Sequence, residues 1–145
     1  MADSTDVRAL AEGFFVVRNG DDPAVATEGV MDRFASNARF QIIGTERLGG
    51  FTRKYEGAEA LRPAVTAFVA DWDLSNLVKV STHTDGDTVF IHWKGKVRFI
   101  PTGQEFETEF MDKMTFRDGK IIDYRQFVDT LGFAETFGMV RLAEE

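Results

Sequence analysis

One acidic residue of the chain lies among large apolar side chains. Residues 105–116 alternate in polarity, and Asp112 falls on the apolar side together with Phe106, Thr108, Phe110, Met114 and Phe116. An ionised carboxylate in such surroundings is destabilised unless it is paired, so we expect Asp112 to be hydrogen-bonded, protonated or next to a cavity. An acid whose pKa is raised by burial is suited to moving protons. Asp112 is therefore the candidate proton carrier.

Two more polar side chains are predicted to share the inner surface with Asp112. The alternation in residues 121–129 predicts an inner face made of Ile122, Tyr124, Gln126 and Val128. A tyrosine hydroxyl can donate a hydrogen bond to a developing oxyanion, and a glutamine can orient a substrate oxygen. These groups match the needs of enolisation or of aldol-type ring closure. The same polar side chains could instead satisfy one another inside a filled core.

The aromatic residues of this chain are mostly apolar. The sequence contains fourteen Phe but only two Tyr and two Trp. Such a composition favours a thick core or a core around an apolar hollow, and a concave apolar surface with a few polar groups is the usual form of a small-molecule site. We predict that Asp112 and Tyr124 are catalytic in such a site and that its ligand contacts Phe14, Ile42, Trp72, Trp93, Phe110, Met114 and Gln126.

Composition argues against several other kinds of site. The chain has no Cys and only two His, which excludes thiolate chemistry and disfavours a metal centre. It contains no glycine-rich phosphate loop and no nucleophile elbow. We therefore predict that no metal and no cofactor takes part, and that the ligand is a small apolar molecule.

The charge and hydropathy of the chain predict its cellular location and exclude some classes of binding partner. A net charge of -7 disfavours binding to nucleic acid or to an anionic membrane surface. No stretch approaches the eighteen or so apolar residues of a membrane span, and the acidic residues 1–6 lack the apolar region of a signal peptide. The sequence thus predicts a cytoplasmic protein that binds neither nucleic acid nor membranes.

The elements that must position these residues follow from periodicity. A first helix is predicted from the spacing of Val7, Leu10, Ala11 and Phe14, a second after Asp22-Pro23, and a third over residues 61–72, with Pro63 at its start or at a kink. Strands are predicted at residues 38–44, 77–84, 88–100, 105–116 and 121–129, and a short helix at residues 131–141. This order predicts a single α+β domain over residues 1–145, with helices on one face of a curved sheet.

Three segments of the chain resemble the SnoaL-like and ketosteroid-isomerase-like families. They are residues 31–35 (MDRFA), 55–62 (YEGAEALR) and 112–130, within a resemblance that covers about residues 7–138. The resemblance implies the cone-shaped fold of nuclear transport factor 2, in which three helices pack on a strongly curved, mostly antiparallel sheet around an apolar cavity. This fold carries isomerases, cyclases, epoxide hydrolases and non-catalytic modules, so it specifies structure better than function.

The catalytic positions of ketosteroid isomerases are only partly present. Asp112 corresponds to the carboxylic acid that helps to form the oxyanion hole of those enzymes. Their partner tyrosine corresponds to Phe14, which cannot donate a hydrogen bond, and their general base corresponds to Ile42, which cannot accept a proton. The resemblance therefore does not support steroid isomerisation by that mechanism.

Two further catalytic sets are absent. Limonene-epoxide hydrolases are similar over residues 88–129, but their two aspartates and arginine correspond to Trp93, Gly95 and Gln126. SnoaL-like cyclases tend to place a histidine and an acid on the last strand, where this chain has Tyr124 and Gln126. Asp112 is the acid that remains.

The outer face of the last strand carries unexpected apolar residues. The alternation predicts that this face consists of Ile121, Asp123, Arg125, Phe127 and Asp129. Ile121 and Phe127 suggest that a second subunit covers part of the surface, and the family resemblance implies a homodimer formed through the outer sheet face.

Two functions are consistent with these features. One is a small enzyme of the isomerase or polyketide-cyclase type, which carries out cofactor-free proton transfer on an apolar, oxygenated substrate. The other is a non-catalytic ligand-binding or dimerisation module with the same pocket. The two differ in whether Asp112 titrates near neutral pH beside an open cavity or is held by internal hydrogen bonds.

Overall fold

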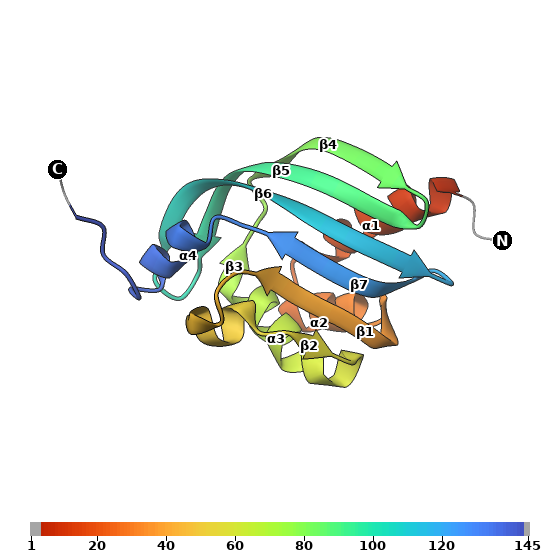
Figure 1. The fold of residues 1–145 in the computed structure, drawn as a ribbon, viewed down its shortest axis with the longest axis horizontal. Helices are drawn as coiled ribbons and strands as arrows, with labels where there is room; N and C mark the ends of the chain where they lie inside the picture. The colour runs from red at the N-terminus through yellow and green to blue at the C-terminus, as the bar shows by residue number, and fades with distance from the viewer. Residues whose placement is uncertain (1–3, 144–145) are drawn as a thin grey trace.

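A computed structural model describes residues 4–143 of the chain, which form an α+β fold with a strongly bent sheet (Figure 1). The helices are α1 (Ser4–Arg18), α2 (Pro23–Met31), α3 (Ala58–Asp71) and α4 (Thr130–Thr136), with a 3-10 helix, η1 (Glu46–Thr52). The strands are β1 (Phe34–Ile43), β2 (Tyr55–Glu56), β3 (Trp72–Asp73), β4 (Leu77–Asp85), β5 (Thr88–Phe99), β6 (Gln104–Arg117) and β7 (Lys120–Phe127).

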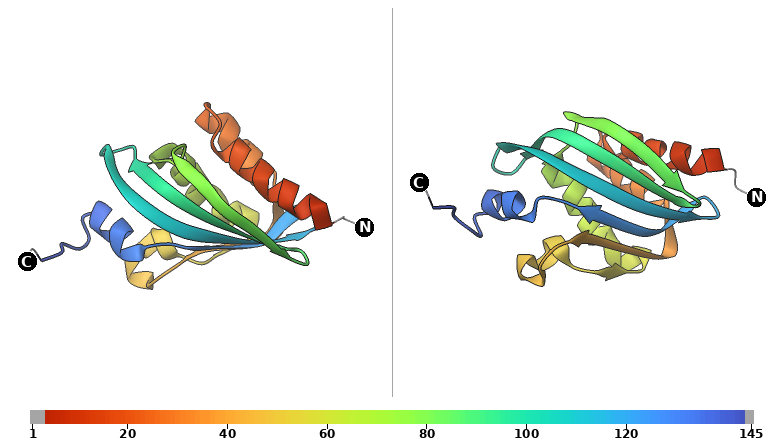
Figure 2. Two further views of the ribbon diagram at one scale, coloured as in Figure 1. Left: turned by 90° about the horizontal axis from the view of Figure 1, so that it is seen from above. Right: turned by 45° about the horizontal axis from the view of Figure 1, so that its top comes forward.

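The strands form one sheet that is antiparallel except at a single pairing in the described part of the chain. Its order is β2-β1-β7-β6-β5-β3, and β4 pairs with β5 beyond the end of β3. Only β1 and β7 run parallel. Helices α1, α2 and α3 pack against one face of the bent sheet, whereas α4 lies at the end of the molecule away from the N-terminus (Figure 2). The predicted fold class and cone-like shape are confirmed.

The boundaries of the helices follow from local chemistry. The Asp22 side chain accepts hydrogen bonds from the backbone N–H groups of Ala24 and Val25, and Pro23 occupies the first turn of α2, as predicted. Helix α3 begins at Ala58, so that Pro63 lies inside it. Helix α4 ends at Thr136, well before the predicted end at residue 141.

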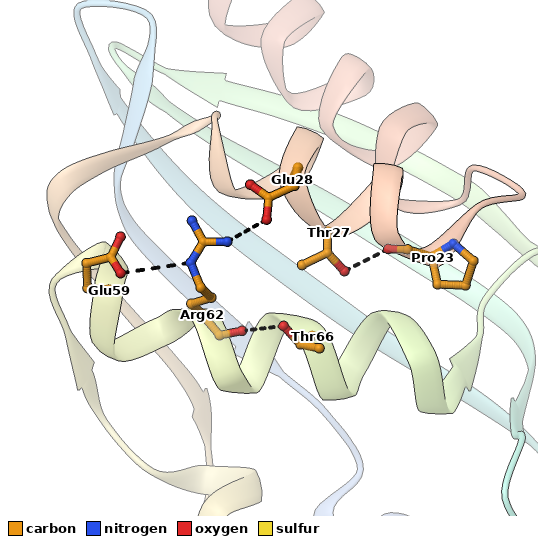
Figure 3. A network of polar contacts seen from close by, with 6 residues as sticks. All are labelled: Pro23, Thr27, Glu28, Glu59, Arg62 and Thr66. Carbon is orange, nitrogen blue, oxygen red and sulfur yellow. Dashed lines mark hydrogen bonds and ion pairs between the residues drawn. The ribbon is translucent and has the colours of Figure 1, made fainter.

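An ion-pair cluster links α2 to α3 on the surface (Figure 3). Arg62 of α3 lies 2.6 Å from the Glu28 carboxylate of α2 and 3.9 Å from Glu59 of its own helix. The three side chains are exposed or partly exposed, so water screens these contacts and each contributes little to stability. The packing of α2 on α3 therefore depends mainly on their buried apolar side chains, among them Val30, Leu61 and Ala64.

The inner face of β6 agrees with the prediction, but the start of β7 does not. Pairing between β6 and β7 shifts after Thr115, which pairs with Asp123, because Phe116 pairs with Ile121. This irregularity gives β7 one extra residue, Ile122, and reverses the alternation before it. Ile121 is fully buried, so the prediction that it faces outward and Ile122 inward was wrong.

A glycine in β5 lies where this strand changes its pairing partner. Gly95 pairs with Leu77 at the start of β4 and has a φ of +145°. A Cβ at this position would lie 2.6 Å from the backbone oxygen of Asn76, which cannot move aside easily. The residue is therefore glycine because two strands approach closely where β5 changes partner from β4 to β3.

Two groups of buried side chains divide the interior. The larger lies between the sheet and helices α1 to α3 and includes Val7, Ala11, Leu61, Ile91 and Met114. The smaller surrounds α4 and includes Trp72, Val97 and Phe133. No helix among residues 4–143 is both long enough and apolar enough to cross a membrane.

Candidate functional site

An apolar pocket opens between the helices and the inner face of the sheet. Its volume is about 100 Å³. The wall is formed by α1, α2, α3, β1, β3, β5, β6 and β7, with η1 and α4 at one end. Six of the predicted site residues lie on this wall: Phe14, Ile42, Trp72, Phe110, Tyr124 and Gln126.

Three of the predicted site residues lie elsewhere. Met114 is fully buried in the core between sheet and helices. Trp93 packs against Phe15 of α1, with ring centroids 4.7 Å apart, and contributes to a separate shallow hollow beside α1. Asp112 is fully buried and is not part of the pocket wall. The inner face of the sheet thus extends beyond the pocket, because α1 packs directly on the part of it that carries Trp93.

The side chain of Gln126 separates Asp112 from the pocket. Asp112 pairs across the sheet with Gln126 of β7, whose amide Nε2 donates a hydrogen bond of 2.8 Å to Asp112 Oδ1. Gln126 itself is on the pocket wall. The other carboxyl oxygen, Oδ2, is buried without a hydrogen-bond partner among residues 4–143. One carboxyl oxygen of Asp112 is therefore hydrogen-bonded, and the other is buried without a hydrogen bond.

Burial makes Asp112 a weak acid. Removal from water raises the pKa of Asp112 to about 7, although Gln126, Tyr124 and Trp93 partly oppose this by favouring the ionised form. The Tyr124 hydroxyl and the Trp93 indole N–H lie near enough to Asp112 to favour the carboxylate as hydrogen-bond donors, although the Trp93 N–H has no well-formed hydrogen bond among the described residues. At neutral pH both the acid and the carboxylate of Asp112 are populated.

Tyr124 is held in place by aromatic rings. Its ring centroid lies 5.6 Å from that of Phe14, 6.4 Å from that of Phe34 and 5.1 Å from that of Phe40. Burial, and then the neighbouring Asp112, raise the pKa of Tyr124 well above its ordinary value. Tyr124 therefore stays a neutral hydrogen-bond donor in a fixed position on the pocket wall, near Asp112.

A cation on the pocket wall was missed at the sequence level. Arg18 ends α1, and its Nη2 donates hydrogen bonds to the backbone oxygens of Phe68 (2.8 Å) and Trp72 (3.0 Å). Burial lowers the pKa of Arg18 to about 10, opposed by Tyr124 and Asp73, so it remains charged at neutral pH. The signal was its spacing, since Arg18 follows Phe14 by four residues on the apolar face of the helix.

Aromatic side chains close the end of the pocket near α4. Phe51 of η1 and Phe133 of α4 have ring centroids 4.9 Å apart, and Phe133 lies 5.0 Å from Trp72. All three line the pocket. Figure 1 shows η1, the gold coil after β1, at the same end of the molecule as α4. Nothing in the sequence pattern of residues 44–57 indicated that Phe51 contacts Phe133.

The residues that the structure describes offer no metal centre. They contain no group of three or more His, Cys, Asp or Glu side chains that could hold an ion. His92 instead pairs with Glu109 on the next strand at 2.6 Å, as expected for cross-strand charges on the outer face.

Comparison with known proteins identifies a family match. The model of the SnoaL-like domain matches residues 9–124. Among curated proteins no relative matches the chain.

Solved structures share the fold at low sequence identity. A Bacillus subtilis protein provisionally classed as an isomerase is 19% identical, with 99% of this chain and 100% of that chain covered and a TM-score of 0.77. TerC, co-crystallised with polyporic acid, is 17% identical, with coverage of 90% and 96% and a TM-score of 0.70. A de novo designed protein with a curved β-sheet is 16% identical, with coverage of 95% and 97% and a TM-score of 0.66.

Proposed function

The chain belongs to the SnoaL-like domain family, within the proteins that resemble nuclear transport factor 2, and we propose that it is a small-molecule enzyme. It would carry out cofactor-free isomerisation or cyclisation by proton transfer on an apolar, oxygenated substrate. The observation that carries this proposal is Asp112, a fully buried acid that has one oxygen without a hydrogen bond. Its other oxygen accepts a hydrogen bond from Gln126, which lies on the wall of an apolar pocket. The isomerase class given to the Bacillus subtilis neighbour and the small molecule in the TerC structure support the proposal at the level of the family.

The proposed roles follow from the positions of the side chains. Tyr124 and Gln126 lie on the wall and hold the carbonyl oxygen of the substrate by hydrogen bonds. Asp112 lies behind them and holds the transferable proton. Because Asp112 is not on the wall, its proton reaches the substrate through the Tyr124 hydroxyl.

The proton transfer balances as a shuttle. Tyr124 gives its hydroxyl proton to the carbonyl oxygen of the substrate while Asp112 gives its own proton to Tyr124. The neighbouring C–H bond breaks, its electron pair forms the C=C bond of an enol, and its proton passes to water. The enol oxygen then returns a proton to Asp112 along the same route. At the same time water returns a proton to carbon: in a substrate with a conjugated second C=C bond, the electron pairs shift and the far carbon of that bond takes the proton, which moves the double bond. In cyclisation the C=C electron pair instead attacks a second carbonyl carbon, whose oxygen takes a proton from water.

Exchange of carbon-bound hydrogen in D₂O tests this proposal without knowledge of the natural substrate. We expect the wild-type protein to accelerate exchange at C1 of 2-tetralone, a compact apolar ketone, as followed by proton NMR. Asp112→Asn removes the acid and Tyr124→Phe removes the relay, so each is expected to lower the protein-dependent rate at least about tenfold.

The control for these variants is Thr108→Val. Thr108 is a buried inward-facing residue of β6 whose hydroxyl has no hydrogen-bond partner in the described chain, and it is not on the pocket wall. Its rate should equal that of the wild type. Unchanged exchange in both Asp112→Asn and Tyr124→Phe, with folding verified by near-ultraviolet circular dichroism, would eliminate the proposed mechanism.

One observation favours the second candidate function, a non-catalytic ligand-binding module. Asp112 Oδ1 is bound to Gln126, and the acid stands behind the wall, as in a structural network. A binding module would take up 2-tetralone without accelerating its exchange beyond the rate in buffer. The same assay therefore separates the two functions.

We also propose that the protein is a homodimer formed through the outer face of the sheet. Met111 of β6 and Phe127 of β7 are direct cross-strand neighbours on this face, and they are 39% and 45% exposed. Apolar side chains side by side on a sheet surface are suited to burial against a second copy. Charged pairs such as Lys96 and Glu105, 3.6 Å apart, would form the rim.

Light scattering coupled to size-exclusion chromatography measures the oligomeric state. The wild-type protein should have twice the mass of one chain, and Phe127→Glu should shift it to one chain because a charge would be buried at the centre of the interface. The control, Val16→Glu, places the same charge on exposed α1 and should leave the dimer intact. A wild-type protein with the mass of one chain would contradict the dimer.

A further inference from the structure

We propose that the pocket selects ring compounds that carry a carboxylate, and that Arg18 is the residue that binds this carboxylate. The inference rests on the proposed function, since it names the substrate class of the same pocket. Arg18 would act as a specificity residue on the same wall as Tyr124, without donating or accepting the transferred proton.

The guanidinium of Arg18 is anchored but not saturated. Both of its hydrogen bonds to the described chain start from Nη2 and reach the backbone oxygens of Phe68 and Trp72. An arginine carries five N–H donors in a rigid, planar fork. Nε and Nη1 therefore have donors left for a ligand, while the two backbone oxygens keep the plane of the group fixed against the wall.

The charge of Arg18 has no carboxylate partner within 4.0 Å among residues 4–143. Asp73 acts on it only from a distance, and Asp73 Oδ1 is already bound by the backbone N–H and hydroxyl of Ser75. Around the half-buried cation the wall is apolar, with Phe14, Phe15 and Leu74. A partly desolvated cation without a partner is costly, and it attracts an anion more strongly than it would in water.

The rest of the pocket defines the orientation of such a ligand. Asp112, behind Tyr124 and Gln126, would repel an anion at that side of the pocket whenever it is ionised. A carboxylate is therefore drawn to Arg18, and a neutral carbonyl group is left for Tyr124 and Gln126. The volume of about 100 Å³ suits a compact ring system whose carboxylate lies at Arg18 and whose carbonyl group lies at Tyr124 and Gln126.

Arg18 also ties the end of α1 to the end of α3, so loss of stability in a variant would not test the inference. The informative readout is the preference for charge between molecules of the same shape. Three pairs of probes provide it: benzoate and benzamide, cinnamate and cinnamamide, and 1-naphthoate and 1-naphthamide. Binding is measured by calorimetry at pH 7.5.

We expect the wild-type protein to bind the carboxylate of each pair at least about tenfold more tightly than the carboxamide. Arg18→Met keeps the apolar stem and removes the charge, so it should bring the ratio to one or below while the carboxamide affinity changes by less than about threefold. Arg117→Met removes an equal charge from the exposed turn between β6 and β7 and should leave the ratio unchanged.

Equal affinity for both members of the pairs in the wild type, or a preference that persists in Arg18→Met, would overturn the inference. The exchange assay separates this failure from failure of the proposed function. Asp112-dependent exchange without a charge preference would eliminate only the proposal that Arg18 binds a substrate carboxylate. A charge preference without Asp112-dependent exchange would support a non-catalytic module that binds anions and would eliminate the proposed enzyme.

Discussion

Asp112 has an environment that a purely structural carboxylate would avoid. A buried carboxylate is stable when hydrogen bonds satisfy both oxygens, yet only Oδ1 of Asp112 is bonded, to Gln126, and Oδ2 is open. Burial of this half-satisfied group raises the pKa of Asp112 to about 7. The fold therefore bears a cost at one residue, as is common at catalytic positions.

The raised pKa of Asp112 predicts how stability depends on pH. The folded protein keeps this proton up to about pH 7, whereas the unfolded chain releases it near pH 4. The folded state therefore binds more protons than the unfolded state in this interval. As the pH rises from about 4 to 7, the contribution of Asp112 to the free energy of unfolding falls by on the order of 4 kcal/mol. Asp112→Asn should lack this fall.

Urea unfolding of both proteins between pH 4.5 and pH 8 measures the difference. Asp85→Asn, in the exposed hairpin between β4 and β5, serves as the control and should follow the wild type. If Asp112→Asn and the wild type lost stability in parallel, Asp112 would not be an acid with a raised pKa in the folded state.

Single residues of the site differed in how far their positions could be predicted. The inward direction of Asp112 and Tyr124 follows from the two-residue period of strands, and both are buried. That Asp112 stands behind the wall could not be predicted, because it depends on Gln126 of the neighbouring strand reaching across it. Arg18 was missed although its helical spacing placed it with Phe14 on the wall.

Among the elements, β5 links two parts of the sheet. Its Gly95 allows the backbone of Asn76 to approach, and beyond it β5 pairs with β3, which carries Trp72 of the pocket wall. A side chain at Gly95 would disturb the backbone that leads from β3 into β4.

Two glycine substitutions test the local demands on these elements. Gly95→Ala meets a backbone oxygen at 2.6 Å in a strained conformation and should destabilise the protein by about 2–3 kcal/mol. Gly13→Ala lies within α1, where its new Cβ would have no atom within 4 Å apart from its chain neighbours and the backbone of its own helix, and it should stabilise the protein by about 0.5–1 kcal/mol. Urea unfolding measures both, and a neutral Gly95→Ala would contradict the close approach.

At the level of elements, prediction succeeded where periodicity was regular. Strands β5 and β6 were predicted nearly to their ends because side chains alternate without interruption along them. The extra residue Ile122 in β7 was missed, since it is defined only by pairing with β6. The end of α4 at Thr136 was also missed, because Gly138 follows with a positive φ of +72° that ends the helix.

In the whole molecule, the fold and the chemistry are separable. A designed protein with a curved sheet shares this architecture, so the bent sheet and its helices do not by themselves imply an activity. The chemistry of this chain rests instead on the polar groups at one apolar pocket: Arg18, Tyr124 and Gln126 on its wall and, behind Gln126, Asp112. Together they supply one cation, two neutral hydrogen-bonding groups and one acid.

The pH dependence of 2-tetralone exchange tests most directly whether the buried acid moves protons for a molecule in the pocket. If the acid form of Asp112 is the active form, the protein-dependent rate should be constant below about pH 7 and should fall about tenfold per pH unit above it. Asp112→Asn should show neither the plateau nor the fall. A wild-type rate that follows the buffer rate at every pH, or a profile that Asp112→Asn leaves unchanged, would contradict the account.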